Sequence, residues 1–157
     1  MKIPRIYLET TVFNFFYADD APEKKQDAIR LFHEIYEGKY EPYTSEAVLE
    51  ELGKATAEKF VQMLSLVEQY SMITLPVTEE ARRLADLYVK EGVIPENYLT
   101  DALHIALATV NDLDYIISYN FRHIVKVKTI TMTESINIRE NYKRIGIFSP
   151  TEVVDYD

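Results

Sequence analysis

The fold is decided by residues 97–118, whose sequence is NYLTDALHIALATVNDLDYIIS. The first part, Asn97–Asn111, predicts a helix that is apolar on most of its circumference, as expected of a helix at the centre of a domain. The last part, Tyr115–Ser118, predicts a short buried strand. Buried strands that alternate with helices are typical of α/β proteins with a parallel sheet.

The rest of the chain continues this alternation. Four further strands are predicted at residues 5–8, 40–44, 72–75 and 127–130. Helices are predicted between the strands. The first has its buried face at Ala28, Leu31, Phe32, Ile35 and Tyr36, and the second is capped by Ser45 and ended by Gly53. Further helices begin at about Thr56 and at Thr78, a later one is opened by Thr131 and Glu134 and stopped by Gly146, and a short last helix lies at Ser149, Pro150 and Glu152. We expect a single domain, residues 1–157, with a three-layer α/β/α architecture around a mainly parallel sheet of about five strands.

Composition favours a folded protein of a reducing compartment. The chain has 157 residues, of which 47% are hydrophobic, and no cysteine for a disulfide or a thiolate metal site. Its N-terminal apolar run is too short for a signal peptide and is interrupted by Glu9. No stretch approaches the roughly 20 apolar residues that span a bilayer, so we predict a soluble, cytoplasmic protein without membrane contact.

The net charge of −9 argues against a non-specific grip on a nucleic-acid backbone. That objection weakens if several acids cluster around a bound metal, or if a basic partner supplies positive charge.

Polar residues follow the predicted strands at one edge of the sheet. Glu9 ends the first strand, Glu51 lies in the helix after the second, and Asp101 lies in the first turn or so of the central helix. Asn120 closely follows the strand Tyr115–Ser118. Ligands of parallel sheets collect beyond the C-terminal ends of the strands, and Mg²⁺ prefers hard oxygen ligands. The sequence therefore predicts a divalent-metal site at this edge.

Each of these residues also has a structural interpretation. Asp101 could simply favour the N-terminus of its helix. A buried acid such as Glu9 is costly unless it is paired, and Arg5 or Arg122 could be its partner. Glu51 could be a solvated residue on its helix, and Asn120 could be a turn residue.

Two histidines lie near the predicted site. His104 follows Asp101 by three residues on the same helix face, where it could orient Asp101 or touch substrate; a hydrogen-bonded core histidine is the commoner outcome. His123 could contact phosphate or pack in a loop. The sequence has no nucleophile-plus-base arrangement, Gly-rich phosphate loop or zinc-ligand spacing.

Four blocks of the sequence, in the correct order, resemble the PIN domain, the fold of many toxin-type endoribonucleases in bacterial and archaeal toxin–antitoxin pairs. The resemblance covers nearly the whole chain. The blocks are Ile6–Phe13 (IYLETTVF), Ser45–Leu52 (SEAVLEEL), Asp101–Ala108 (DALHIALA) and Tyr115–Ile124 (YIISYNFRHI).

The resemblance implies a ribonuclease of the VapC kind that uses Mg²⁺ or Mn²⁺. Glu9, Glu51 and Asp101 would hold the metal, and Asn120 would complete the catalytic set. The family generally has Asp where this chain has Glu9, whose side chain is longer by one C–C bond, about 1.5 Å. An Asp is also common at the position of the neutral Asn120. Three carboxylates remain, which is enough for one Mg²⁺ ion.

The resemblance also implies contacts with partners. Thr10, Thr11, Arg122 and His123 would contact the RNA substrate. A cognate antitoxin would cover apolar surface, for which the aromatic segment 13–17 is a candidate, although such aromatics more often belong to the core. PIN-like domains are often homodimers.

Two other functions fit part of the pattern. A PIN-like domain with weakened catalysis, acting as an RNA- or protein-binding module, is favoured by Glu9, Asn120 and the acidic balance, whereas Glu51 and Asp101 favour the enzyme. A phosphoryl-transfer receiver or phosphatase would need a phosphate-accepting Asp at the end of the first strand, where Glu9 is a poor substitute.

Overall fold

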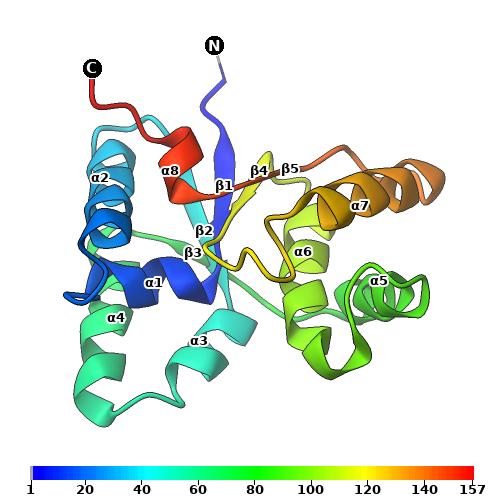
Figure 1. The fold of residues 1–157 in the computed structure, drawn as a ribbon, viewed down its shortest axis with the longest axis horizontal. Helices are drawn as coiled ribbons and strands as arrows, with labels where there is room; N and C mark the ends of the chain where they lie inside the picture. Colours follow the sequence, from blue (N-terminus) through cyan, green and yellow to red (C-terminus); the bar gives the residue numbers. More distant parts are fainter. Residues whose placement is uncertain (1) are drawn as a thin grey trace.

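The computed structural model, which describes residues 2–157, has a five-stranded sheet between two layers of helices (Figure 1). The strands are β1 (Arg5–Leu8), β2 (Glu41–Ser45), β3 (Ile73–Leu75), β4 (Tyr115–Ile117) and β5 (Gly146–Phe148). Their order is β3-β2-β1-β4-β5, and every neighbouring pair is parallel. The central position of β1 places the residue after it, Glu9, between the ends of β2 and β4.

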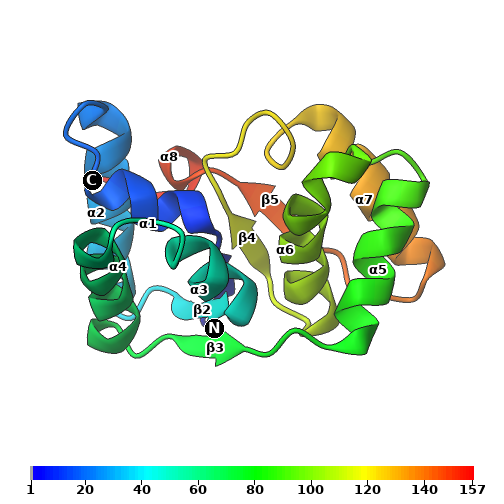
Figure 2. The same ribbon diagram turned by 90° about the horizontal axis from the view of Figure 1, so that it is seen from below.

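Helices cover both faces of the sheet. They are α1 (Thr10–Phe16), α2 (Pro22–Tyr36), α3 (Glu46–Leu52), α4 (Ala57–Gln69), α5 (Glu79–Lys90), the 3₁₀ helix η1 (Glu96–Tyr98), α6 (Leu99–Val110), α7 (Val127–Arg139) and α8 (Pro150–Val153). Figures 1 and 2 show α1, α2 and α4 on one side of the sheet and α5, α6 and α7 on the other. This confirms the predicted three-layer α/β/α architecture.

The middle of the sheet is fully buried. Ile6, Tyr7 and Leu8 of β1 and Ile116 and Ile117 of β4 have no exposed surface. Such a continuous apolar run is expected of a parallel strand that is covered on both faces. Leu8 pairs in register with Ile117, so the polar residues that follow these two strands emerge side by side.

Most predicted helix boundaries are confirmed. Ser45, Thr56 and Thr78 are N-caps whose side chains accept a hydrogen bond from the helix backbone, and Gly53 is the C-cap of α3. Ser149 and Glu152 form the predicted capping box. These caps satisfy N–H groups that the helix itself leaves unpaired.

The predicted strand at residues 127–130 is wrong, because this segment begins α7. Its β-branched residues suggest a strand locally, but the buried residues of α7 are Thr129, Thr133, Ile136 and Asn137. These lie on one face at helical spacing, and tertiary packing of that face overrides the local propensity. Thr131 is therefore an internal residue of α7, and the predicted N-terminal capping box there is also wrong.

The fifth strand lies instead at Gly146–Phe148, where we had predicted only a helix stop at Gly146. α7 already ends at Arg139. A Cβ atom at Gly146 would approach ring atoms of Phe148 and Tyr115 to 2.6 and 2.8 Å. A larger residue at this position would force one of these rings to move, so glycine favours the packing of this edge strand beside β4. Within residues 2–157, no helix is long and apolar enough to cross a membrane.

Candidate metal centre

Glu9 lies at the junction of β1 and α1 and is 2% exposed. It is the N-cap of α1, and its Oε1 atom accepts hydrogen bonds from Thr11 N (3.2 Å), Thr11 Oγ1 (2.5 Å) and Ser118 Oγ (2.6 Å). Burial raises the pKa of the Glu9 carboxyl, and this outweighs the opposing effects of His104 and of these hydrogen bonds. Neither Arg5 nor Arg122 is its partner among the ion pairs of residues 2–157.

Glu51, on α3, forms an ion pair with His104 of α6. The distance from His104 Nε2 to Glu51 Oε1 is 2.5 Å, and Thr10 Oγ1 donates to the same oxygen over 2.6 Å. Burial favours a higher pKa for Glu51, but the hydrogen bond and charge of His104 prevail and the pKa is lowered. His104 and Thr10 therefore both contact the same oxygen of the Glu51 carboxylate.

His104 is completely buried and hydrogen-bonded at both ring nitrogens. Its Nδ1 atom lies 2.6 Å from Tyr7 Oη, which in turn lies 2.7 Å from Ser45 Oγ. Burial alone would lower the pKa of His104, but Glu51 and the charges of Glu9 and Asp101 raise it. The predicted hydrogen-bonded core histidine is confirmed, and its neighbour Glu51 links it to the candidate site.

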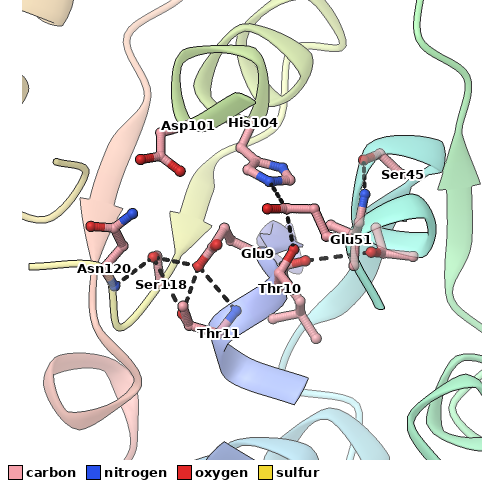
Figure 3. A network of polar contacts seen from close by, with 12 residues as sticks. Glu9, Thr10, Thr11, Ser45, Glu51, Asp101, His104, Ser118 and Asn120 are labelled. Atoms are coloured by element: carbon pink, nitrogen blue, oxygen red, sulfur yellow. Dashed lines mark hydrogen bonds and ion pairs between the residues drawn. The ribbon is translucent and has the colours of Figure 1, made fainter. Parts of the chain in front are cut away.

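Glu9, Glu51 and His104 each place one potential ligand atom within 4.8 Å of the others. Both ring nitrogens of His104 are engaged by Tyr7 and Glu51, so the two glutamates are the candidate ligands of this group and His104 positions Glu51. The three residues come from the end of β1, from α3 and from α6, so the fold alone brings them together. Figure 3 shows the three side chains converging at the edge of the sheet. The hydrogen bonds described above end on Oε1 of both glutamates, which leaves their Oε2 atoms for a further ligand. The oxygen-rich donor set fits Mg²⁺ or Mn²⁺.

Asp101 lies beside this cluster and is paired with a different histidine. The distance from its Oδ2 atom to His123 Nδ1 is 3.1 Å, and the side chains are 14% and 10% exposed, respectively. In Figure 3, the Asp101 carboxylate and the Asn120 amide lie near one another on the far side of Glu9 from Glu51. Sequence reasoning missed both the His104–Glu51 and the His123–Asp101 pairs.

Asn120 shapes the loop that follows β4. Its N–H group donates to Ser118 Oγ (2.9 Å), and its Oδ1 atom accepts from the N–H group of His123 (2.9 Å). These are the hydrogen bonds of a turn residue. They also fix the backbone that carries His123 toward Asp101.

The other predicted site residues surround this centre. Thr10 donates to Glu51, and Thr11 both donates to Glu9 and accepts from the N–H group of Tyr119 (2.8 Å). Arg122 is exposed, with its guanidinium carbon 5.8 Å from the centre of the Tyr98 ring. Tyr98 also stacks against His123, with ring centres 4.0 Å apart.

A cavity of about 230 Å³ opens beside Glu51, between α3, α5 and α6. Its lining combines Lys54 and Arg82 with Leu99 and Leu103. Glu50 and Glu51 line the same hollow, so it places acidic, basic and apolar side chains next to one ligand of the candidate centre.

Comparisons with known proteins identify the fold. A chain of VapBC2 from Rickettsia felis, determined bound to a DNA fragment from the promoter, superposes with a TM-score of 0.54 at 12% sequence identity, covering 92% of this chain and 98% of that chain. A chain of VapBC-5 from Mycobacterium tuberculosis, a member of the VapBC family of toxin–antitoxin systems, gives a TM-score of 0.43 at 23% identity over 73% of this chain and 83% of that chain. No protein-family profile and no curated protein matches the sequence. The chain therefore has a VapC-like PIN fold, which confirms the prediction made from the four sequence blocks.

Proposed function

We propose that this protein is a divalent-metal-dependent endoribonuclease, the toxin of a toxin–antitoxin pair. The observation that carries the proposal is the convergence of Glu9, Glu51 and His104 at the C-terminal edge of the sheet, with Asp101 alongside. A buried carboxylate without a Lys or Arg partner is costly, so its presence at this edge favours a cationic ligand. The VapC-like fold supports the same assignment.

In the proposed reaction, Glu9 and Glu51 would hold the ion and Asp101 would contribute directly or through water. Bound Mg²⁺ or Mn²⁺ supplies an activated water for attack on a phosphodiester and stabilises charge on the phosphate oxygens. Thr11 and Ser118 fix the Glu9 carboxylate, whereas Thr10 and His104 fix that of Glu51. These contacts provide the second layer of hydrogen bonds that orients metal ligands in proteins.

RNA would be bound by the loop after β4 and by the hollow beside Glu51. Arg122 is available to phosphate on one side of the centre, and Lys54 and Arg82 on the other, whereas His123 is buried and paired with Asp101. This local positive charge offsets part of the repulsion that a net charge of −9 imposes on a polyanion. A substrate of cellular RNA would place the protein in the cytoplasm.

The proposed antitoxin is a basic protein, because the toxin itself is acidic. The fold comparison with a VapBC structure supports an antitoxin partner, and its basic character is inferred from charge alone. Of the aromatic segment 13–17, Phe13 is fully buried, and Phe16 and Tyr17 pack against the core. Partner binding would therefore use other surface as well, and a homodimer stays a prediction.

A catalytically weakened binding module is the second candidate. Asn120 adds no charge to the site, and its Oδ1 atom already accepts a hydrogen bond from His123. Glu51 Oε1 is likewise engaged by the hydrogen bond with His104. Both features would lower metal affinity relative to a site of four free carboxylates.

The two candidates are separated by mapping new RNA ends. Mixed cellular RNA would be incubated with Mg²⁺ or Mn²⁺ and the wild-type protein, with Asp101→Asn and EDTA as controls. Discrete ends that require both metal and Asp101 are the expected result. Folded protein that produces no such ends would favour the binding module.

A further inference from the structure

Beside the candidate metal centre, three aromatic rings and one lysine form a second group of side chains, which we call the aromatic platform. It consists of Phe15 from α1, Lys24 from α2, and Tyr119 and Phe121 from the loop after β4. Lys24 Nζ lies 4.9 Å from the centre of the Phe15 ring, 5.6 Å from that of Phe121 and 5.9 Å from that of Tyr119. Of these residues only Phe15, as part of the aromatic segment 13–17, has been given a role above.

The platform is rigid at its base and open at its top. Tyr119 is 5% exposed, and its hydroxyl donates to the carbonyl oxygen of Lys24 over 2.8 Å. Phe15 packs edge-on against Tyr119 with ring centres 4.8 Å apart. Phe121, by contrast, is 47% exposed, although its ring centre lies only 6.3 Å from that of Tyr119. A large aromatic ring that is half exposed on a fixed support is an available stacking surface.

Hydrogen bonds connect the platform directly to the metal centre. The N–H group of Tyr119 donates to Thr11 Oγ1 (2.8 Å), and Thr11 Oγ1 donates to Glu9 Oε1 (2.5 Å). Phe121 follows Asn120 in the chain, and its N–H group donates to the carbonyl oxygen of Tyr119 (3.0 Å). The loop that carries Phe121 is therefore joined to the candidate metal centre through Tyr119 and Thr11.

Lys24 gives the platform a positive charge that has no acidic partner within 4.0 Å among residues 2–157, whereas its neighbour Lys25 forms an ion pair with Asp19. A cation over aromatic rings is stabilised by their negative faces, yet it remains available to an anion. An exposed ring beside an unpaired cation is complementary to a nucleotide, which offers a flat base and a phosphate together. Such a cation is notable because the chain as a whole has a net charge of −9.

We infer that the aromatic platform is a nucleotide subsite: an unpaired base of the bound RNA stacks on Phe121, and Lys24 contacts the adjacent phosphate. The inference rests on the proposed function and deepens it, because it assigns a base-binding position next to the cleavage site. Stacking on one face of a ring tolerates any base, so the subsite contributes affinity for RNA and no sequence specificity. It accepts only a base that is not stacked within an RNA helix.

The test measures binding in EDTA, so that no cleavage is needed. Fluorescence anisotropy would follow a mixed-sequence RNA of about 12 nucleotides, within the span of single-strand sites, and a matched RNA whose central riboses lack bases. Phe121→Ala, Phe121→Tyr and Lys24→Gln would be compared with the wild type. Tyr36→Ala is the control, because Tyr36 is 81% exposed at the other end of α2.

Phe121→Ala is expected to weaken binding of the normal RNA about 5-fold or more and to leave the abasic RNA unaffected. Phe121→Tyr should bind like the wild type, because it keeps the ring. Lys24→Gln should weaken both RNAs and lower the slope of log affinity against log salt by about 0.7, as expected for one lost contact to a single strand. Tyr36→Ala should change nothing.

Three results would overturn the inference: equal RNA affinity of Phe121→Ala and Tyr36→Ala, no preference of the wild type for bases over abasic RNA, or no binding of RNA. The first is also the result expected if the platform receives a protein instead. Metal-dependent cleavage that persists in Phe121→Ala at unchanged affinity would refute the subsite and leave the nuclease intact. Base-dependent binding without any cleavage would keep the subsite and refute the nuclease.

Discussion

Each edge of the sheet carries a carboxylate next to a strand, but the two carboxylates have different hydrogen-bonding partners and opposite pKa shifts. At the N-terminal edge, Asp114 precedes β4. It accepts the N–H group of Arg5 at Oδ2 (2.7 Å) and the ammonium group of Lys143 at Oδ1 (2.8 Å). Partial burial tends to raise the pKa of Asp114, but these partners and the charge of Arg5 lower it. Both of its oxygens are occupied.

At the C-terminal edge, Glu9 is almost completely buried and its pKa is raised by that burial. Its hydrogen bonds come from neutral donors and end on one oxygen. A stabilising acid is paired with cations, as Asp114 is; an acid kept buried with a free oxygen is suited to a ligand that arrives later. The difference supports the proposal that the C-terminal edge is the functional one and the N-terminal edge is structural.

The largest expected effect is on cleavage. Asp101→Asn and Glu51→Gln each remove one negative charge from the functional edge while keeping the side-chain shape. We expect each to lower the rate of metal-dependent RNA cleavage by about 100-fold or more, in the range seen when a group that stabilises the transition state is lost. The rate would be measured on an RNA that end mapping has identified. Undiminished cleavage by Asp101→Asn would remove Asp101 from the site.

Glu9→Gln separates stability from metal binding. The amide keeps an oxygen for Thr11 and Ser118 but removes the buried charge, so the melting temperature without metal should stay the same or rise. Excess Mn²⁺ should stabilise the wild type, by about 2.7 kcal/mol at a hundred times the dissociation constant, and should not stabilise the variant. Thermal unfolding with and without Mn²⁺ measures both effects. A variant that Mn²⁺ stabilises as strongly as it does the wild type would show that Glu9 is not a ligand.

Asn120→Asp tests whether the loop after β4 faces the metal. A carboxylate at this position adds a charged oxygen ligand, so Mn²⁺ should bind several-fold more tightly. The Asp side chain can still accept the hydrogen bond from His123, which preserves the turn. Calorimetry would show the gain, and an unchanged affinity would mean that position 120 points elsewhere.

Asp114→Asn is the control at the structural edge and has the smallest expected effect. The variant loses the ion pair with Lys143, whose side chain is 43% exposed, but can keep the hydrogen bond from Arg5. We expect a loss of about 0.5–1 kcal/mol in the free energy of unfolding, as for other partly exposed ion pairs. Urea unfolding would measure it. A loss of cleavage rate in Asp114→Asn as large as that in Asp101→Asn would contradict the division between the two edges.

The sequence predicts the sheet well because buried parallel strands leave an unmistakable apolar run. Ile6–Leu8 and Tyr115–Ile117 are such runs. Glu9, after the first run, and Asn120, shortly after the second, could be placed at the C-terminal edge by topology alone. The strand Gly146–Phe148 was missed because it has only three residues, one of them a glycine whose role is to make room for two rings.

The histidine pairs could not be predicted, because they depend on distances between separate elements. His104 and Glu51 are on different helices and meet only when α3 and α6 pack together. The spacing of Asp101 and His104 suggested that they share a helix face, but it did not reveal that each would pair with a different partner. The turn at Asn120 followed from its residue type, but its hydrogen bond to the N–H group of His123, which pairs with Asp101, did not.

The most direct test of a functional C-terminal edge is a calorimetric titration with Mn²⁺ in the absence of RNA. We predict that the wild type and Asp114→Asn bind the ion with the same affinity, and that Glu51→Gln and Glu9→Gln lose most of that affinity. Equal binding by the wild type and the two glutamine variants, or loss of binding in Asp114→Asn, would contradict the assignment of the metal centre to this edge of the sheet.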